Sequence, residues 1–381
     1  MKVLYDSQVF DMQKSGGISR YFIEIIKNLP KNIEYQLPLT YSDNVYLNEY
    51  KITDLYNNSR KEKYYNFIPN LNFKGKYRLK LIRNKLFYSD FKDNRLMDIE
   101  ALKNQNFDIF HPTYYDPYFL DFIGNKPYVL TIHDMIHEKY PEMLLDIKTI
   151  YNKKLLANNA EHIIAISEQT KQDIIDILRI PEKKISVIYH GTTNISISEN
   201  NYVNKYGKYF LFTGTRLNYK NFNFMLISLA DWLHEHKDVK LLCTSSPFNE
   251  LENKLIISLG LENQIINVFF SNDFEMYQLY HNAIAFIFPS YAEGFGIPVL
   301  EAFQAECPVI LTEIPCFKEI ACDAGIYFSP KKKNELVYAV NLIYSDSAIR
   351  DKLILAGKRR LSSFSWEKTA IQTSNVYYNC L

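Results

Sequence analysis

Residues 293–301 read Glu293-Gly-Phe-Gly-Ile-Pro-Val-Leu-Glu301 and follow the apolar run Ala285–Phe288. The run favours a buried strand, and Pro298 is typical of the first turn of a helix. We therefore expect a strand, a loop that carries Glu293 and a helix that carries Glu301. Gly294 and Gly296 let a ligand approach the backbone and expose amides at the helix start. Carboxylates beside such a helix start suit a ligand with hydroxyls and phosphates, bound at the carboxyl edge of a sheet.

A second stretch, Phe212–Asn221, repeats this arrangement. Gly214 ends the apolar run Tyr209–Phe212, and a helix is predicted from about Asn221. Arg216 and Lys220 stand in the loop between them, where two cations at a helix N-terminus can hold a diphosphate. Solvated surface cations are the alternative interpretation of this loop taken alone. Because the Glu293–Glu301 stretch lies in the same half of the chain, we favour a bound diphosphate over solvated surface cations.

Apolar runs recur along the whole chain and alternate with stretches of helical periodicity. Runs buried on both faces and separated by helices are typical of parallel sheets, so we predict an α/β fold. Ser167 is suited to cap a helix over Glu168–Leu178. The predicted strands are Val3–Tyr5, Tyr35–Leu39, Ile109–Phe110, Tyr128–Ile132, Ile163–Ile166, Ser186–Tyr189, Tyr209–Phe212, Lys240–Cys243, Ile266–Phe270, Ala285–Phe288, Val309–Thr312 and Ile326–Phe328.

The length and composition limit the class of protein. The 381 residues fit about two domains, and the polar, aperiodic stretch Gly191–Tyr206 is the predicted boundary. A net charge of +1 argues against a nucleic-acid partner, and no apolar run is long enough to span a membrane. The five cysteines form no C-x-x-C pair, which indicates reduced thiols and no zinc site. The start, Met1–Asp6, does not fit a secretory signal, so we expect a cytoplasmic protein.

One segment is strongly basic. Arg60–Lys85 holds nine Lys and Arg residues against one acid, Glu62, with Tyr and Phe residues interleaved. Such a segment can lie on an anionic membrane surface, which would make the protein peripheral at the inner face of the membrane. A solvated surface insertion is the alternative interpretation.

Taken together, these motifs resemble the family-4 glycosyltransferases, which are retaining enzymes of the GT-B fold. Glu293 and Glu301 match the family's E-x7-E signature, and Gly214, Arg216, Lys220 and Asn221 match its G-x-R-x-x-x-K-N stretch. Ile164–Lys171, Val187–Gly191 and Ser363–Glu367 resemble further family segments. His133-Asp134 resembles branches that use GDP-mannose in bacterial O-antigen and polysaccharide synthesis.

The resemblance implies two Rossmann-like domains that face each other across a cleft. The acceptor-side domain would span residues 1–195 and the nucleotide-sugar domain residues 205–366, with the last helix, about 367–381, packed back on the first domain. Metal and cofactor would be absent, because cations and helix termini neutralise the diphosphate.

The resemblance also implies roles for individual residues. Arg216 and Lys220 would stabilise the leaving nucleotide, Glu293 would face the transferred sugar, and His133 would lie near its C6 hydroxyl. Glu301 would bind the ribose, while Gly16 and Gly17 would form the glycine-rich loop near the phosphates. The remaining predicted donor contacts are Gly214, Gly294, Phe295, Gly296 and Ile297, and the predicted acceptor-side residues are Arg20, Tyr114, Asp134 and His137.

The predicted activity is a metal-independent hexosyltransferase that retains the anomeric configuration. It would move a sugar, with GDP-mannose as the first choice of donor, to a glycan or lipid-linked glycan of the cell surface. The alternative is the same reaction with a UDP-sugar such as UDP-glucose, UDP-galactose or UDP-GlcNAc. A more remote alternative is a non-catalytic GT-B subunit that binds a partner.

Overall fold

The N-terminal domain is built on parallel strands that follow the apolar runs of the first half of the chain. The computed structural model describes residues 1–381 except 53–72, 74, 88–92, 145, 193–202 and 271. Strands β2, β1 and β3 form one three-stranded sheet and β4, β5 and β6 another, and a bridge between Phe110 and Tyr128 joins them. The strands are β1 (Lys2–Tyr5), β2 (Glu34–Gln36), β3 (Ile109–His111), β4 (Val129–Ile132), β5 (His162–Ala165) and β6 (Ile185–Val187).

Helices connect these strands and cover the sheet, as parallel pairing requires. Their buried residues form two clusters, one around Tyr21, Phe22 and Ile25 and the other around Phe110, Phe119 and Leu156. The helices are α1 (Gln8–Met12), α2 (Gly17–Lys27), α3 (Val45–Tyr50), α5 (Lys76–Phe87), α6 (Asn94–Asn104), α7 (Ile136–Lys139), α8 (Ile147–Asn159) and α9 (Glu168–Asp173), with short helical turns at Pro117–Asp121, Ile174–Leu178 and Glu182–Lys184.

The C-terminal domain has one six-stranded parallel sheet, in the order β12-β11-β10-β7-β8-β9. The chain therefore reverses its direction of winding between β7 and β10, and ligands bind at such a switch point in open α/β sheets. The strands are β7 (Lys208–Phe212), β8 (Val239–Thr244), β9 (Ile265–Val268), β10 (Phe286–Phe288), β11 (Val309–Thr312) and β12 (Gly325–Phe328). Their helices are α10 (Phe222–Glu235), α11 (Glu250–Ser258), α12 (Asp273–His281), α13 (Ile297–Gln304), α14 (Pro315–Ala321), α15 (Lys333–Ser345) and α16 (Ser347–Leu361), with a short turn at Asn218–Lys220.

The predicted α/β class is confirmed, but some predicted boundaries were wrong. Of the predicted strand Tyr35–Leu39, only Tyr35 and Gln36 pair in the sheet, within β2. The predicted strand Ile266–Phe270 ends with β9 at Val268, so Phe269 and Phe270 leave the sheet and are exposed. Glu168–Leu178 is α-helical only to Asp173 and continues as a wider π-type turn. Ser167 caps this helix as expected, because its side chain accepts a hydrogen bond from the Thr170 amide.

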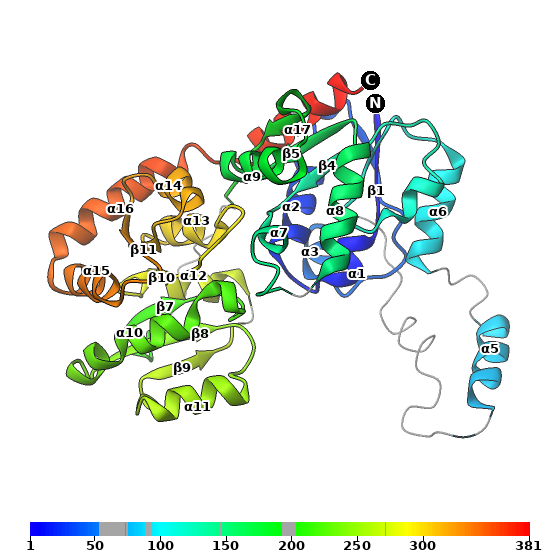
Figure 1. Cartoon of the computed structure of the whole chain (residues 1–381). Coiled ribbons are helices and arrows are strands. Elements are labelled where there is room, and N and C mark those ends of the chain that lie inside the picture. The colour runs from blue at the N-terminus through cyan, green and yellow to red at the C-terminus, as the bar shows by residue number, and fades with distance from the viewer. Residues whose placement is uncertain (53–72, 74, 88–92, 145, 193–202, 271) are drawn as a thin grey trace.

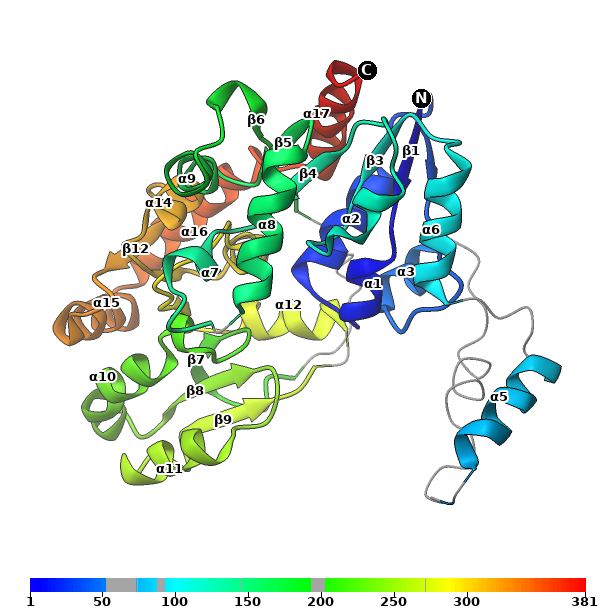
Figure 2. The same ribbon diagram turned by 45° about the vertical axis from the view of Figure 1, so that its right-hand side comes forward.

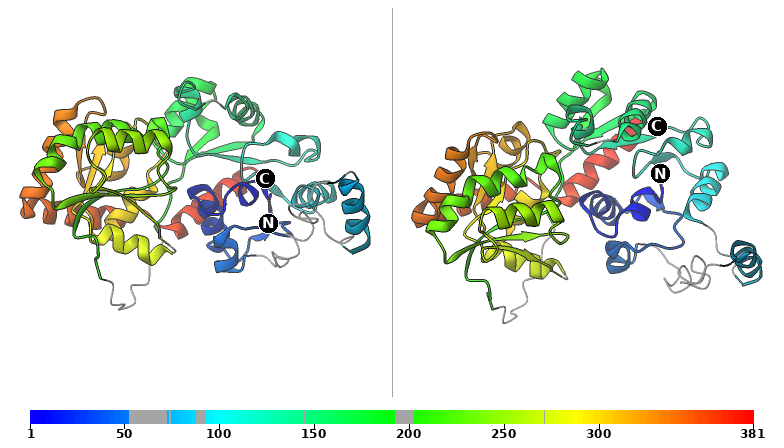
Figure 3. Two further views of the ribbon diagram at one scale, coloured as in Figure 1. Left: turned by 90° about the horizontal axis from the view of Figure 1, so that it is seen from below. Right: turned by 60° about the horizontal axis from the view of Figure 1, so that its bottom comes forward.

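The last helix, α17 (Trp366–Asn379), crosses back to the N-terminal domain and packs against α2 (Figures 1 and 3). The Tyr377 hydroxyl lies 2.6 Å from Nδ1 of His111 and 2.9 Å from the Tyr5 hydroxyl, so α17 is bonded to the interior of that domain. Where the N-terminal domain ends, a bridge joins Thr192 to Ser365, which directly precedes α17. The two backbones come so close that a Cβ on Gly191 would lie 2.1 Å from the Trp366 nitrogen.

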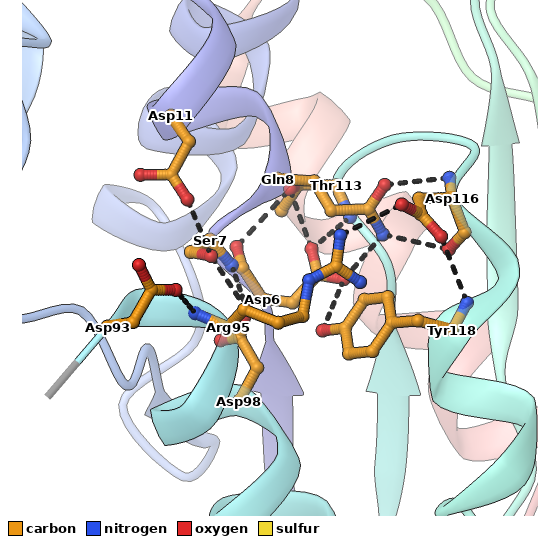
Figure 4. Close-up of polar contacts among 10 residues, drawn as sticks. All are labelled: Asp6, Ser7, Gln8, Asp11, Asp93, Arg95, Asp98, Thr113, Asp116 and Tyr118. Carbon is orange, nitrogen blue, oxygen red and sulfur yellow. Dashed lines mark hydrogen bonds and ion pairs between the residues drawn. The ribbon is translucent and has the colours of Figure 1, made fainter. Parts of the chain in front are cut away.

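A network of buried polar side chains fixes the carboxyl end of β1 (Figure 4). Asp6 accepts hydrogen bonds from the Thr113 amide and from Gln8, and Asp98 accepts from the amide and hydroxyl of Ser7. Burial raises the pKa of both carboxyls, and the charge of Asp6 raises that of Asp98 further. The pair therefore links α6 to β1. It also keeps a proton at pH values at which an exposed carboxyl has lost its own.

Most of the predicted basic segment Arg60–Lys85 lies outside the described residues. Its end forms α5, which lies beyond α6 at the outer side of the N-terminal domain (Figures 1 and 2). Tyr77, Leu79 and Ile82 are exposed on this helix. Within the described parts of the chain, no helix combines the length and apolar character needed to cross a bilayer.

Candidate active site

The two predicted motif loops meet at the switch point of the C-terminal sheet. The Lys220 ammonium lies 2.6 Å from Oε1 of Glu293, and both side chains are nearly buried, at 12% and 11% exposure. Lys220 follows β7 and Glu293 follows β10, so the pairing of these neighbouring strands brings the two residues together. A lysine has three donors, which leaves Lys220 able to bind a phosphate oxygen while it holds Glu293.

Glu301 lies on the first turns of α13, as the Pro298 signal predicts. Oε2 accepts a hydrogen bond of 3.2 Å from the Tyr280 hydroxyl, and Oε1 lies 3.5 Å from Nη1 of Arg20, on the other domain. Burial raises the pKa of Glu301, and the charge of Arg20 partly opposes this. The carboxylate has lone pairs to spare and can accept hydrogen bonds from ribose hydroxyls.

The loop between β10 and α13 touches the N-terminal domain. A Cβ on Gly294 would lie 1.8 Å from the carbonyl oxygen of His133, so only glycine allows this approach. Ser167 donates a hydrogen bond of 2.7 Å to the Gly294 carbonyl. Gly296 precedes α13 with φ of 103°, a conformation that favours glycine. Phe295 is buried and packs its ring against His190, 4.8 Å between centroids, which leaves only its backbone for a ligand.

The N-terminal wall of the cleft carries the other predicted donor residues. Gly16 and Gly17 lead into α2, and the Gly17 Cα faces Ile297, whose Cδ1 would contact a Cβ at 3.5 Å. His133 follows β4 and is buried. Burial lowers its pKa to about 4, so the imidazole is neutral at pH 7. Nε2 of His133 is buried and has no hydrogen-bond partner among the described residues.

The predicted acceptor-side residues gather around the turn after His133, except for Arg20. Asp134 accepts a hydrogen bond from the Ile136 amide, and His137 Nδ1 lies 4.0 Å from its Oδ1. Tyr114 packs on Tyr115 with 4.7 Å between ring centroids.

Sequence reasoning missed Lys153, which is buried to 1% exposure. Its ammonium binds Glu138 at 3.0 Å and the Asp134 carbonyl at 2.9 Å, so it holds the turn that carries His133 and Asp134. The residues around Lys153 give no sign that this lysine is buried, because packing brings its partners, Glu138 and Asp134, from another segment of the chain.

Arg216 is bonded to the start of α11 and to the turn before it, and its buried Nη1 has no hydrogen-bond partner among the described residues. Its Nε lies 2.9 Å from Glu252, Nη2 donates to the carbonyls of Ser246 and Pro247, and the side chain is 3% exposed. The guanidinium lies 5.7 Å from the Phe222 ring and 4.9 Å from the Phe248 ring. Gly214, at φ of 97°, does line the cleft cavity.

A large cavity lies between the domains, with a volume of about 790 Å³. The starts of α2, α12 and α13 all border it, and the amides at helix starts favour anions. Among its described lining residues are the predicted Gly16, Gly17, Ile297 and Glu301. No cluster of three or more His, Cys, Asp or Glu residues suited to a metal ion occurs in the described chain.

Comparison with known proteins identifies the family of the chain. The model described as Glycosyltransferase Family 4 matches residues 15–193, and the model described as Glycosyl transferases group 1 matches residues 193–360. The chain is 26% identical to an uncharacterized glycosyltransferase of Methanocaldococcus jannaschii over 68% of its length and 70% of the relative. It is also 26% identical to the O-antigen chain mannosyltransferase RfbU of Salmonella typhimurium, over 56% of this chain and 60% of that one.

A solved structure with the same fold is that of Anabaena HepE in complex with UDP-glucose. It aligns over 100% of both chains with a TM-score of 0.70 and 18% sequence identity. The two family models together span residues 15–360, one for each domain around the cleft. The protein belongs to the family-4 glycosyltransferases of the GT-B fold.

Proposed function

We propose that the protein transfers mannose from GDP-mannose to a hydroxyl of a glycan or lipid-linked glycan, with retention of the anomeric configuration. The observation that carries the proposal is the Lys220–Glu293 pair, which lies at the switch point where the donor sugar and diphosphate would meet. The choice of mannose is supported by the relative RfbU, an O-antigen chain mannosyltransferase.

In this reaction the bond between the sugar C1 and the donor β-phosphate oxygen breaks, and a bond from C1 to the acceptor oxygen forms on the same face. The acceptor proton passes to the departing phosphate oxygen. Lys220 stabilises the charge that develops on that phosphate. Glu293 orients Lys220 and accepts a hydrogen bond from a hydroxyl of the sugar. Neutral His133 forms a hydrogen bond with another sugar hydroxyl through Nε2. The cleft between the domains excludes water from the reacting centre.

A thermal-shift panel with GDP, UDP, ADP and dTDP tests the donor class. A ligand at about 100 times its Kd adds about 2.7 kcal/mol of stability, which raises Tm by a few degrees. GDP-mannose is then incubated with a saccharide acceptor in EDTA, and the anomeric proton of the product is read by NMR. Transfer with retention in EDTA is expected. A requirement for a divalent metal, or an inverted product, would contradict the proposal.

A UDP-sugar is the second candidate donor, because the HepE structure of the same fold holds UDP-glucose. The same thermal-shift panel distinguishes a GDP-linked donor from a UDP-linked donor. A shift with UDP and none with GDP would replace the mannose donor and keep the site. No shift with any nucleotide would favour a non-catalytic subunit.

We also propose a peripheral location at the cytoplasmic face of the membrane, through the segment Arg60–Lys85. Its described part, α5, combines the basic residues Lys76, Arg78, Lys80 and Arg83 with exposed Tyr77. Anionic vesicles should bind the protein, less so at high salt, while neutral vesicles should not. Tyr77→Ala should weaken this binding. Equal binding to both kinds of vesicle would overturn the proposal.

A further inference from the structure

The turn that follows β4 is the part of the N-terminal domain that touches the loop of Glu293. A Cβ on Gly294 would lie 1.8 Å from the His133 carbonyl oxygen, so the two backbones are in contact there. Burial and the charges of Glu293 and Asp134 raise the pKa of Tyr219, so both carboxylates lie near this hydroxyl. The position of the His133–Asp134 turn therefore affects both sides of the site.

A buried lysine of α8 holds this turn. The Lys153 ammonium donates to the Asp134 carbonyl at 2.9 Å and to Oε2 of Glu138 at 3.0 Å. Lys153 is 1% exposed and Glu138 is 3% exposed, so the pair has almost no contact with solvent. The ammonium also lies 5.2 Å from the centre of the Tyr115 ring, whose hydroxyl accepts a hydrogen bond from the His133 amide. Both peptide groups of the turn are thus bonded to Lys153 or to a side chain packed on it.

Stability alone is a weak reason for a buried pair of this kind. Both charges lose their hydration, and apolar side chains in place of a buried ion pair are often neutral or stabilising. A lysine differs from an apolar side chain in that its three donors can hold a carbonyl and a carboxylate at once. The Lys153 charge also acts on the site. Burial lowers the pKa of His133 to about 4, the charge of Asp134 opposes this shift, and that of Lys153 adds to it.

We propose that Lys153 is a positioning residue of the transfer reaction, which holds the His133–Asp134 turn where His133 and Glu293 meet the donor sugar. The proposal rests on the proposed function. Lys153 contacts no reacting atom and acts through the Asp134 carbonyl, because this hydrogen bond fixes the direction of the backbone from which the imidazole projects. The titratable or charged groups that face His133 are Tyr21 of α2, His111 of β3, Tyr115, Asp134, Lys153 of α8 and His190.

Four variants separate positioning from stability. Lys153→Arg keeps the charge, and Lys153→Met removes the ammonium and leaves Glu138 unpaired. The double variant Lys153→Met with Glu138→Gln removes both charges but still leaves the Asp134 carbonyl without its donor. The matched control is Lys154→Met, which changes the next lysine of the same helix, an exposed one.

The Tm and the steady-state rates of each variant are measured. The rate is read as GDP released from GDP-mannose with octyl α-mannoside as the acceptor probe, across the pH range in which the protein stays folded. UDP release from UDP-glucose replaces it if the thermal-shift panel selects UDP.

Lys153→Met is expected to lower kcat roughly tenfold to a hundredfold with little change in KM for the donor. Without the ammonium, Asp134 raises the pKa of His133, so the loss of kcat on acidification should begin at a higher pH than in the wild type. The double variant should regain most of the Tm but not kcat. Lys153→Arg should recover part of kcat, and Lys154→Met should match the wild type.

Two results in an active wild type would overturn the assignment. One is a double variant that regains kcat together with Tm, because the pair would then serve stability alone. The other is a Lys153→Met variant with wild-type kcat and an unshifted pH profile. A wild type that releases neither nucleotide from its sugar donor would remove the proposed function as well, and so is distinguishable from these two results.

Discussion

At the scale of single residues, the Lys220–Glu293 ion pair carries the chemistry. Lys220→Ala removes the charge beside the leaving phosphate and leaves a nearly buried carboxylate unpaired. We expect kcat to fall by roughly a hundredfold or more. Initial rates at saturating donor provide the measurement. The matched control is Lys208→Ala, which breaks an exposed pair with Asp238 of 2.8 Å and should change neither rate nor Tm. A normal kcat in Lys220→Ala would remove this residue from the mechanism.

The Asp6–Asp98 pair makes a residue-scale prediction about pH. Burial and mutual repulsion raise the pKa of Asp98, so the folded chain keeps a proton that the unfolded chain loses above about pH 4. Stability from this site is therefore present at low pH and declines as pH rises toward the folded pKa. The facing charged or titratable groups are Asp6, Asp11, Arg95, Asp116 and Tyr118 (Figure 4).

Asp98→Asn should flatten this decline and raise the stability at neutral pH. An asparagine oxygen can still accept both bonds from Ser7, and its amide replaces Oδ1 of Asp98, which has no hydrogen-bond partner in the part of the chain that the structure describes. Each unit of raised pKa corresponds to about 1.4 kcal/mol at neutral pH. Urea unfolding between pH 4 and 8 measures the effect. If the stability of the variant and of the wild type changed with pH in the same way, the folded chain would not keep a proton at Asp98.

At the scale of elements, the buried Tyr377 hydroxyl is one of the contacts that hold α17 to the N-terminal domain. Tyr377→Phe leaves Nδ1 of His111 and the Tyr5 hydroxyl without this partner, which should destabilise the protein by about 1–3 kcal/mol. The neighbouring Tyr378→Phe is the control, because its hydroxyl bonds Asn32 at the surface. Denaturant unfolding compares them. Equal stability of the two variants would mean that the Tyr377 hydroxyl adds nothing to the docking of α17.

At the scale of the whole molecule, Gly294 permits the domains to meet. An added Cβ would collide with the His133 carbonyl at 1.8 Å, while Gly294 itself has no left-handed backbone strain. Gly294→Ala should therefore hold the cleft open and lower kcat by roughly a hundredfold, since misplacing reacting groups by about 1 Å has that effect. Small-angle scattering with bound nucleotide should show a larger radius of gyration than the wild type. A wild-type radius and rate would mean that activity does not need this contact.

The sequence by itself determined the α/β class, the strand positions and the local place of each motif. These features depend on neighbours in the chain: the apolar runs become strands, Pro298 starts α13, and Ser167 caps α9. The proximity of Lys220 and Glu293 was predictable too, because both follow strands that end at one sheet edge.

Only the tertiary structure decided which partners the predicted cations contact. Arg216 fits the spacing of the motif, and its Nε pairs with Glu252 of α11, 36 residues away. Arg20 borders the cavity because Asp273, 253 residues away, comes to lie beside α2. The direction of a long charged side chain depends on partners that packing brings from distant parts of the chain, and no local pattern encodes that choice.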